Sequence, residues 1–198
     1  MTTETVTRST RETDITVSLS MDRAEESKIN SGVPLFDHFL EAAAFSGGFS
    51  LSLAAEGDLE RDDHHTLEDT GIVIGTAVRR IADTLHPVCR YSWAVIPMDE
   101  ALVRTAVDIG GRSFLKYDLA LSRRTLGGIS TENIKEFFFG FCRESGSALH
   151  ITRLSGENNH HIAEAAFKSF GIVLSRALSP AGGRTAASTK EMSTGGGT

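Results

Sequence analysis

Residues 62–71 read DDHHTLEDTG, and residues 158–166 read NNHHIAEAA. Each stretch holds two adjacent histidines and, three residues after the second one, a glutamate. Four of the 7 histidines in the chain lie in these two stretches. A pattern written twice at the same spacing indicates an internal duplication, so the segments that precede each copy should correspond as well.

The preceding segments do correspond. In the first half, a helical pattern over residues 35–45, a Gly-Gly pair, a strand pattern over 49–55 and a turn lead to the helix that His64 opens. In the second half, a helical pattern over 131–144, Gly146, a strand pattern over 148–154 and a shorter turn lead to the helix that His160 opens. This alignment matches His38 with Glu136. The order predicts an α+β fold with an internal duplication.

The domain limits follow from the outer segments. TDITVSLSMD (13–22) alternates polar and apolar residues, as a half-buried strand does. The C-terminal PAGGRTAASTKEMSTGGGT is poor in apolar residues and rich in Gly, Ser and Thr. We expect a flexible N-terminus over 1–10, a first half-repeat over 11–98, a second over 99–180, and a flexible tail over 181–198.

Composition excludes several classes of protein. The 198 residues are 40% hydrophobic and 23% charged, which suits a globular domain, and the net charge of -6 argues against nucleic-acid binding. Cys89 and Cys142 lack the spacing of a disulfide framework. The sequence starts without a signal-peptide pattern and has no run long enough to cross a membrane, so we expect a cytoplasmic protein without membrane contact.

The repeated histidines and glutamates are candidate metal ligands. Adjacent residues on a helix point ~100° apart, so the two histidines of one pair fit two different ions better than one. Nitrogen and oxygen donors together suit a catalytic Mn, Fe or Zn ion. We interpret His86 and His150 as structural. The eight candidate ligands are His38, His64, His65, Glu68, Glu136, His160, His161 and Glu164.

Five runs, in this order, carry a family resemblance: GVPLFDHFL, GDLERDDHHTLEDTGIVIG, PMDEALVRTAVDIGGR, NNHHIAEAAFKSFG and the tail STK. Over residues 11–190 they resemble the imidazoleglycerol-phosphate dehydratase family of histidine biosynthesis. The resemblance implies two superposable halves, each a four-stranded sheet with two helices on one face. It implies a hydro-lyase that eliminates water from imidazole glycerol phosphate to give imidazole acetol phosphate. It also implies a 24-subunit homo-oligomer with two Mn²⁺ per active site, built between subunits.

The resemblance assigns residues to roles. One ion would take His38, His65, His160 and Glu164, and the other His64, Glu68, residue 136 and His161. Position 136 is often His in the family and is Glu here, and a carboxylate can replace imidazole on Mn. The residues around the substrate's phosphate would be Arg90, Arg112, Lys168, Ser188 and Lys190. Glu12 matches the family's acidic residue at the substrate. Glu12 is the candidate base, and His64, Glu68, His160 and Glu164 complete the catalytic set. Asp99 and Glu100 are interpreted as structural.

Two other classes of function fit the same ligands. A dinuclear metallohydrolase could cleave a phosphate ester, although such sites usually contain a bridging Asp or Glu rather than an imidazole-rich set. A non-enzymatic cage could store metal ions, but it would have no use for Arg90, Arg112 and Lys190. Release of free phosphate would distinguish the hydrolase from a dehydratase. Loss of turnover at unchanged metal content, after mutation of these basic residues, would distinguish an enzyme from the cage.

Overall fold

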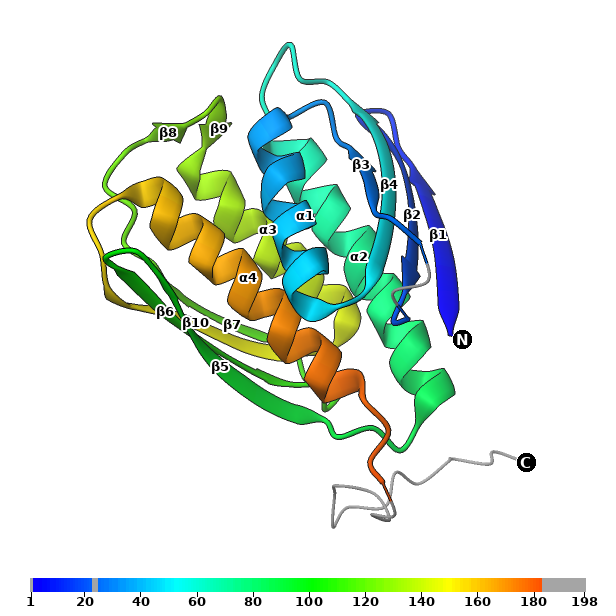
Figure 1. The fold of residues 1–198 in the computed structure, drawn as a ribbon. Helices are drawn as coiled ribbons and strands as arrows, with labels where there is room; N and C mark the ends of the chain where they lie inside the picture. Colours follow the sequence, from blue (N-terminus) through cyan, green and yellow to red (C-terminus); the bar gives the residue numbers. More distant parts are fainter. Residues whose placement is uncertain (1, 23–24, 183–198) are drawn as a thin grey trace.

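Two four-stranded sheets enclose four helices in the computed structural model, which describes residues 2–22 and 25–182 (Figure 1). The positions Ser188 and Lys190 lie outside the described residues. Within the described ranges, no helix is both long enough and apolar enough to cross a membrane.

The first half of the chain runs strand, strand, strand, helix, strand, helix. Its long helix begins at the first histidine pair and ends at Leu85, two residues before Pro87. The elements are β1 (Thr3–Ser9), β2 (Thr13–Ser20), β3 (Lys28–Asn30), α1 (Pro34–Gly47), β4 (Ser50–Gly57) and α2 (His64–Leu85).

The second half repeats this order, with one short hairpin, β8 and β9, inserted before its first helix. The elements are β5 (Tyr91–Met98), β6 (Ala101–Asp108), β7 (Phe114–Asp118), β8 (Thr125–Leu126), β9 (Ile129–Ser130), α3 (Thr131–Ser145), β10 (Ala148–Ser155) and α4 (Asn159–Leu178).

The two sheets have the same topology. Their strand orders are β1-β2-β4-β3 and β5-β6-β10-β7. In each sheet the first two pairings are antiparallel and the last is parallel. The predicted duplication and the predicted fold class are therefore confirmed.

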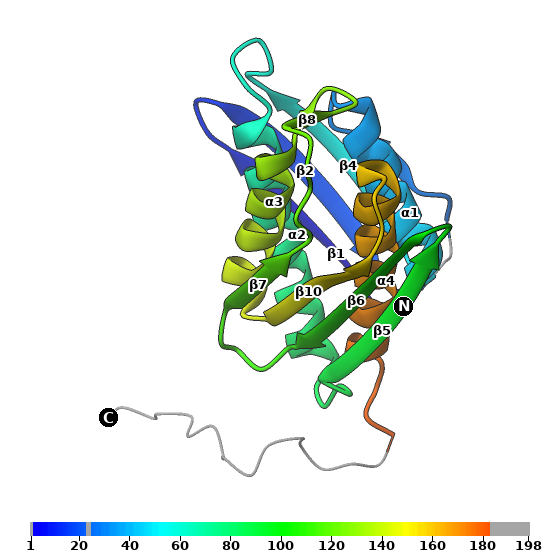
Figure 2. The same cartoon turned by 90° about the vertical axis from the view of Figure 1, so that its left-hand side faces the viewer.

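The helices form the inner layers of a sandwich. α1 and α2 cover the first sheet, and α3 and α4 cover the second. Figure 1 shows the helices between the two sheets, and Figure 2 shows the same layers with the second sheet towards the viewer. Across the middle, α1 packs on α4 and α2 packs on α3. Each helix that carries a histidine pair therefore lies beside a helix from the other half of the chain.

Glycines bring these helix pairs close together. A Cβ atom on Gly75 would lie 2.6 Å from the carbonyl oxygen of Phe141, and one on Gly171 would collide with the carbonyl oxygen of Ala43. Aromatic rings fill the centre of the layer, where Phe36 of α1 meets Phe137 of α3 edge-on at 5.3 Å. Close backbones and interlocked rings fix the position of the helices to which the candidate ligands belong.

Two of the expected segment boundaries are wrong, namely the flexible segment 1–10 and the start of the second half-repeat at residue 99. Residues 3–9 are not flexible: they form β1, which pairs with β2 along its whole length, buries Val6 and is linked to α2 by Arg8. The second half does not start at 99, because β5 forms a hairpin with β6 in the second sheet. The second unit thus begins after α2 ends, near residue 88.

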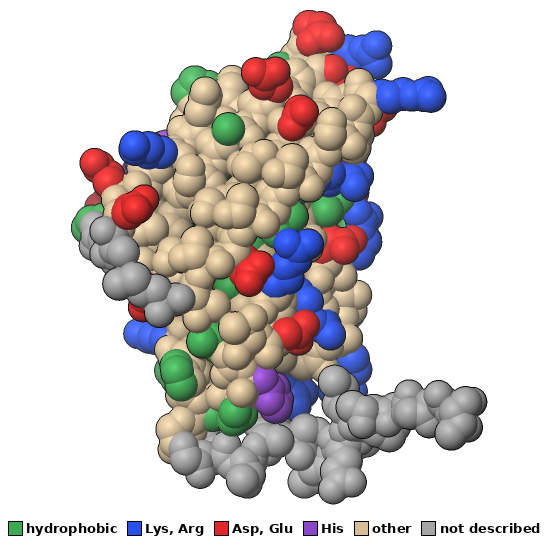
Figure 3. Space-filling view, turned by 90° about the vertical axis from the view of Figure 1, so that its right-hand side faces the viewer, with side chains coloured by type: hydrophobic (Ala, Val, Ile, Leu, Met, Phe, Trp, Pro, Cys, Tyr) green, Lys and Arg blue, Asp and Glu red, His purple; other side chains and the backbone are tan. Residues whose placement is uncertain are grey.

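The outer faces of the two sheets differ. The first sheet exposes hydroxyls, among them Thr7 and Thr16, whose side-chain oxygens lie 3.0 Å apart, and this face is mostly neither charged nor hydrophobic (Figure 3). The second sheet exposes large apolar side chains instead, with Trp93 68%, Tyr91 55% and Phe114 54% exposed.

Candidate functional site

The N-terminal turns of α2 and α4 position the repeated histidines. The side chain of Asp62 accepts a hydrogen bond from the backbone N–H of His64, and Asn158 does the same for His160. Both bonds use a short polar side chain two residues before the first histidine, as helix N-termini commonly do. The polar pairs DD and NN that precede the histidines therefore hold both helix starts in the same way.

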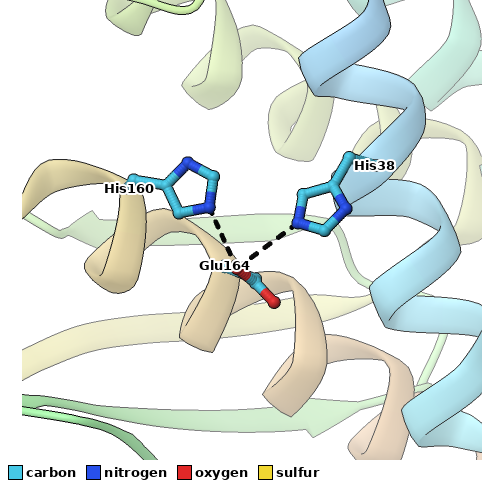
Figure 4. Close-up of side chains that lie close together, drawn as sticks. All are labelled: His38, His160 and Glu164. Atoms are coloured by element: carbon cyan, nitrogen blue, oxygen red, sulfur yellow. Dashed lines mark hydrogen bonds and ion pairs between the residues drawn. The ribbon is translucent and has the colours of Figure 1, made fainter.

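Three of the candidate ligands come together within the chain. His38 Nε2 and His160 Nε2 lie 3.4 and 3.1 Å from the same oxygen, Oε2 of Glu164 (Figure 4). The two imidazoles stack with their centroids 5.7 Å apart. In residues 2–22 and 25–182, these side chains are the one group of three or more His, Cys, Asp or Glu residues whose ligand atoms all lie within 4.8 Å of one another. Two nitrogens and a buried carboxylate oxygen fit a divalent cation of the Mn or Zn kind.

The surroundings of Glu164 favour its charged form. Burial raises the pKa of the carboxyl, but hydrogen bonds from Lys168 and His38 lower it by more, so the pKa lies below its ordinary value. Lys168 Nζ contacts the other oxygen, Oε1, at 2.8 Å. Glu164 is therefore available as an anionic ligand.

The corresponding cluster on α2 is more open. His64 Nε2 lies 3.6 Å from Glu68 Oε2, and Arg143 of α3 contacts the other oxygen of Glu68 at 3.3 Å. His64 Nδ1 lies 3.1 Å from the amide oxygen of Asn133. Glu136 is half-buried on α3, one turn after Asn133. Among the described residues, Glu136 does not form a group with His64 and Glu68 in which all ligand atoms lie within 4.8 Å of one another.

The structure supports the match of His38 with Glu136. α1 and α3 both end at a left-handed glycine, Gly48 and Gly146, and each glycine comes ten residues after the matched position (48 − 38 and 146 − 136). His38 lies on the helix that packs against the helix of Glu164, and Glu136 lies on the helix that packs against the helix of Glu68.

The second histidine of each pair lies apart from these clusters. His65 Nδ1 is 3.1 Å from Asp58 Oδ1, and its Nε2 is 3.7 Å from Glu12 Oε2. His161 Nδ1 is 2.8 Å from Glu100 Oε2. The hydrogen bond that His65 donates to Asp58 raises the pKa of His65, and the hydrogen bond from His161 is the main cause that lowers the pKa of Glu100, to about 2. Glu100 was interpreted as structural and Asp58 was not singled out; both contact candidate ligands.

The expected phosphate-binding arginines lie at the other end of the molecule. The backbone N–H of Arg90 donates to Ala177 near the end of α4, whereas His160 opens that helix. Seventeen residues (177 − 160) of α-helix span roughly 25 Å. The Arg90 side chain is paired with Asp108 at 2.6 Å, and Arg112 is exposed in the loop that follows β6.

The outer-face position of His150 agrees with a structural role. It is exposed on β10 and its ring lies 5.4 Å from that of Phe114. Its neighbours Leu149 and Ile151 are fully buried towards the helices. His150 therefore lies on the opposite face of the sheet from both clusters.

The chain matches known proteins along most of its length. Residues 31–174 match the family model of imidazoleglycerol-phosphate dehydratase. Two proteins of that name are similar: that of Methanosphaerula palustris is 45% identical over 87% of this chain and 89% of its own, and that of Thermoanaerobacter pseudethanolicus is 47% identical over the same shares. The crystal structure of the Staphylococcus aureus dehydratase has a TM-score of 0.82 and 36% identity, covering 90% of this chain and 99% of its own. The chain belongs to the imidazoleglycerol-phosphate dehydratase family.

Proposed function

We propose that the chain eliminates water from imidazole glycerol phosphate to give imidazole acetol phosphate, with two Mn²⁺ ions per active site. Family membership supports dehydratase chemistry, and so a lyase of histidine biosynthesis. The observation that carries the proposal is the pair of equivalent ligand clusters at the starts of α2 and α4. The proposed compartment is the cytoplasm, supported by the two cysteines, which form no disulfide.

The ligands divide into two sets. His38, His160 and Glu164 would hold one ion together with His65 of a neighbouring subunit, and His64, Glu68 and Glu136 would hold the other with a neighbour's His161. Bound Mn²⁺ would supply Lewis acidity, which stabilises negative charge on the substrate. Inter-subunit ligands are proposed because His65 and His161 lie outside the clusters of their own chain.

The substrate's phosphate would be bound by Arg90, Arg112, Lys168, Ser188 and Lys190. In one chain, Arg90 and His160 are separated by most of the length of α4. Arg90 and Arg112 can therefore serve a substrate at the histidines only if they come from another subunit. The exposed aromatic face of the second sheet supports self-association, and we propose the 24-subunit assembly.

Glu12 is proposed as the base. Its carboxylate is half exposed and lies on the Nε2 side of His65, where the side chain can reach a bound molecule. It would accept the proton from the carbon that bears the second hydroxyl, while hydroxide leaves from the carbon next to the imidazole. The resulting enol tautomerises to the ketone, so the reaction releases one water and needs no redox cofactor.

Incubation of the Mn-loaded protein with imidazole glycerol phosphate tests the proposal. NMR should show imidazole acetol phosphate and no inorganic phosphate. Arg112→Ala removes an exposed cation and should raise KM with little change in Mn content, because it takes charge from the phosphate site. Lys28→Ala, an exposed cation on the edge strand β3, should leave both values unchanged.

Two results would overturn it. Release of inorganic phosphate would identify a metallohydrolase. Full Mn binding without consumption of this substrate would leave a metal-binding cage.

A further inference from the structure

Each histidine that lies outside the clusters is held by a carboxylate at its Nδ1. For His65 the partner is Asp58, in the loop between β4 and α2, with a side chain only 12% exposed. For His161 it is Glu100, in the tight turn between β5 and β6. Glu100 is itself anchored, because its other oxygen accepts the backbone N–H of Asn158 at 2.8 Å.

These contacts determine which ring nitrogen carries the hydrogen. A carboxylate can only accept a hydrogen bond, so Nδ1 of both imidazoles must carry the hydrogen. A neutral imidazole with hydrogen on Nδ1 has its lone pair on Nε2. Both rings therefore carry the lone pair on Nε2, which lies 3.7 Å from Glu12 Oε2 in His65 and 3.6 Å from Asp99 Oδ2 in His161.

The two carboxylates come from positions that are not related by the repeat. β2 and β6 are eight-residue strands with the same alternation of buried residues, and this alignment places Glu12 on Glu100. The strand alignment of β4 with β10 places Asp58 on Gly156, which has no side chain. The second half thus has no counterpart of Asp58. Its histidine, His161, is instead held at Nδ1 by Glu100 from the turn between β5 and β6.

This difference bears on Glu12. In the second half, the carboxylate of this turn is bound to Nδ1 of the histidine. In the first half, Asp58 takes Nδ1, and Glu12 lies on the opposite, Nε2 side of His65. The replacement leaves Glu12 without a contact to Nδ1 of its own histidine, whereas the equivalent Glu100 has one.

We propose that Asp58 and Glu100 are positioning residues that fix His65 and His161 with Nε2 directed outward as a metal ligand, and that Asp58 thereby leaves Glu12 for the substrate. The inference rests on the proposed function. Partners that bind the far nitrogen of a ligating imidazole commonly change metal affinity by about 10- to 100-fold when they are removed.

Mn²⁺ affinity of the intact protein without substrate, followed by the EPR signal of free Mn²⁺, provides the test. Glu100→Ala and Asp58→Ala should each weaken one of the two ions by about 10- to 100-fold, while saturating Mn²⁺ still gives two ions per chain and restores most of kcat. Glu100→Gln should recover much of the lost affinity, since its amide oxygen still accepts from Nδ1. Glu60→Ala and Glu157→Ala remove equally charged, exposed neighbours and should change nothing.

Unchanged affinity in Glu100→Ala and Asp58→Ala would overturn the proposal, as would a loss in Glu100→Gln equal to that in Glu100→Ala. Glu100 is 41% exposed, so its variants should fold even if the Asp58 variants do not. Metal affinity of the variants tests this proposal, whereas turnover of imidazole glycerol phosphate by the wild-type protein tests the proposed function. The two can therefore fail independently.

Discussion

Glu68 and Glu164 occupy the same position of the two repeats and have different surroundings. Glu164 is 8% exposed and bonded by His38, His160 and Lys168. Glu68 is 25% exposed and pairs with His64 of its own helix and with Arg143 of α3. Both carboxylates thus have a cation and an imidazole as partners, although the cations come from different elements. The two proposed ions should therefore differ in affinity.

Glu136 distinguishes the two ions most clearly. Glu136→Ala removes one of the proposed ligands of a single ion, so that ion should be lost first and should return with excess Mn²⁺, while the half-occupied protein is nearly inactive. Glu136→His should keep much of the activity, since imidazole suits the same ion. Metal analysis beside the turnover assay measures both. His150→Ala, on the outer face of the second sheet, is the control and should keep two ions per chain. Loss of an ion from His150→Ala but not from Glu136→Ala would refute the ligand set.

At the scale of elements, the site depends on how closely α1 approaches α4 and α2 approaches α3. Gly171 and Gly75 are equivalent in the repeat, and each faces a carbonyl oxygen of the partner helix. Rigid backbone contact of this kind allows no room for a methyl group. The same contact fixes the distance between His38 on α1 and Glu164 on α4.

Gly171→Ala should therefore separate α1 from α4. We expect a loss of about 1–3 kcal/mol in the free energy of unfolding, typical of overpacking, together with weaker Mn²⁺ binding. Denaturant melts and Mn²⁺ titration measure the two effects. Ser175→Ala, at a half-exposed position one turn later on α4, should leave both unchanged. Normal stability and affinity in Gly171→Ala would mean that the helix contact does not hold the cluster.

The sequence predicted the elements whose pattern is local. The start of α2 at His64 was predicted from the repeated histidine pattern, and the apolar residues that follow it repeat at helical spacing. β1 was missed because TETVTRS buries only Val6 as an edge strand, so little apolar alternation remains to be seen. Among the site residues, the repeated HHxxE pattern marked the candidate ligands. Asp58 and Glu100 reach their histidines only through the packing of turns from different parts of the chain, which no local spacing reveals.

At the scale of the whole molecule, the pseudo-twofold arrangement places both histidine-bearing helix starts at one end and Arg90 at the other. One chain alone cannot bring these groups to one small substrate. If ions bind across subunits, they stabilise only the assembled form. Chelation should then yield smaller species, and Mn²⁺ should restore the large one. Light scattering measures this, and a chelator-treated sample that stays large, or a fully active metal-loaded monomer, would contradict shared sites.

The most direct measurement is turnover of imidazole glycerol phosphate by the metal-free protein as Mn²⁺ is added in steps. Two distinct ligand clusters at the starts of α2 and α4 predict that product formation stays low up to one ion per chain. It should then rise to a plateau at two, with imidazole acetol phosphate as the product. A plateau at one ion per chain, or turnover that does not depend on added metal, would contradict the two-cluster account.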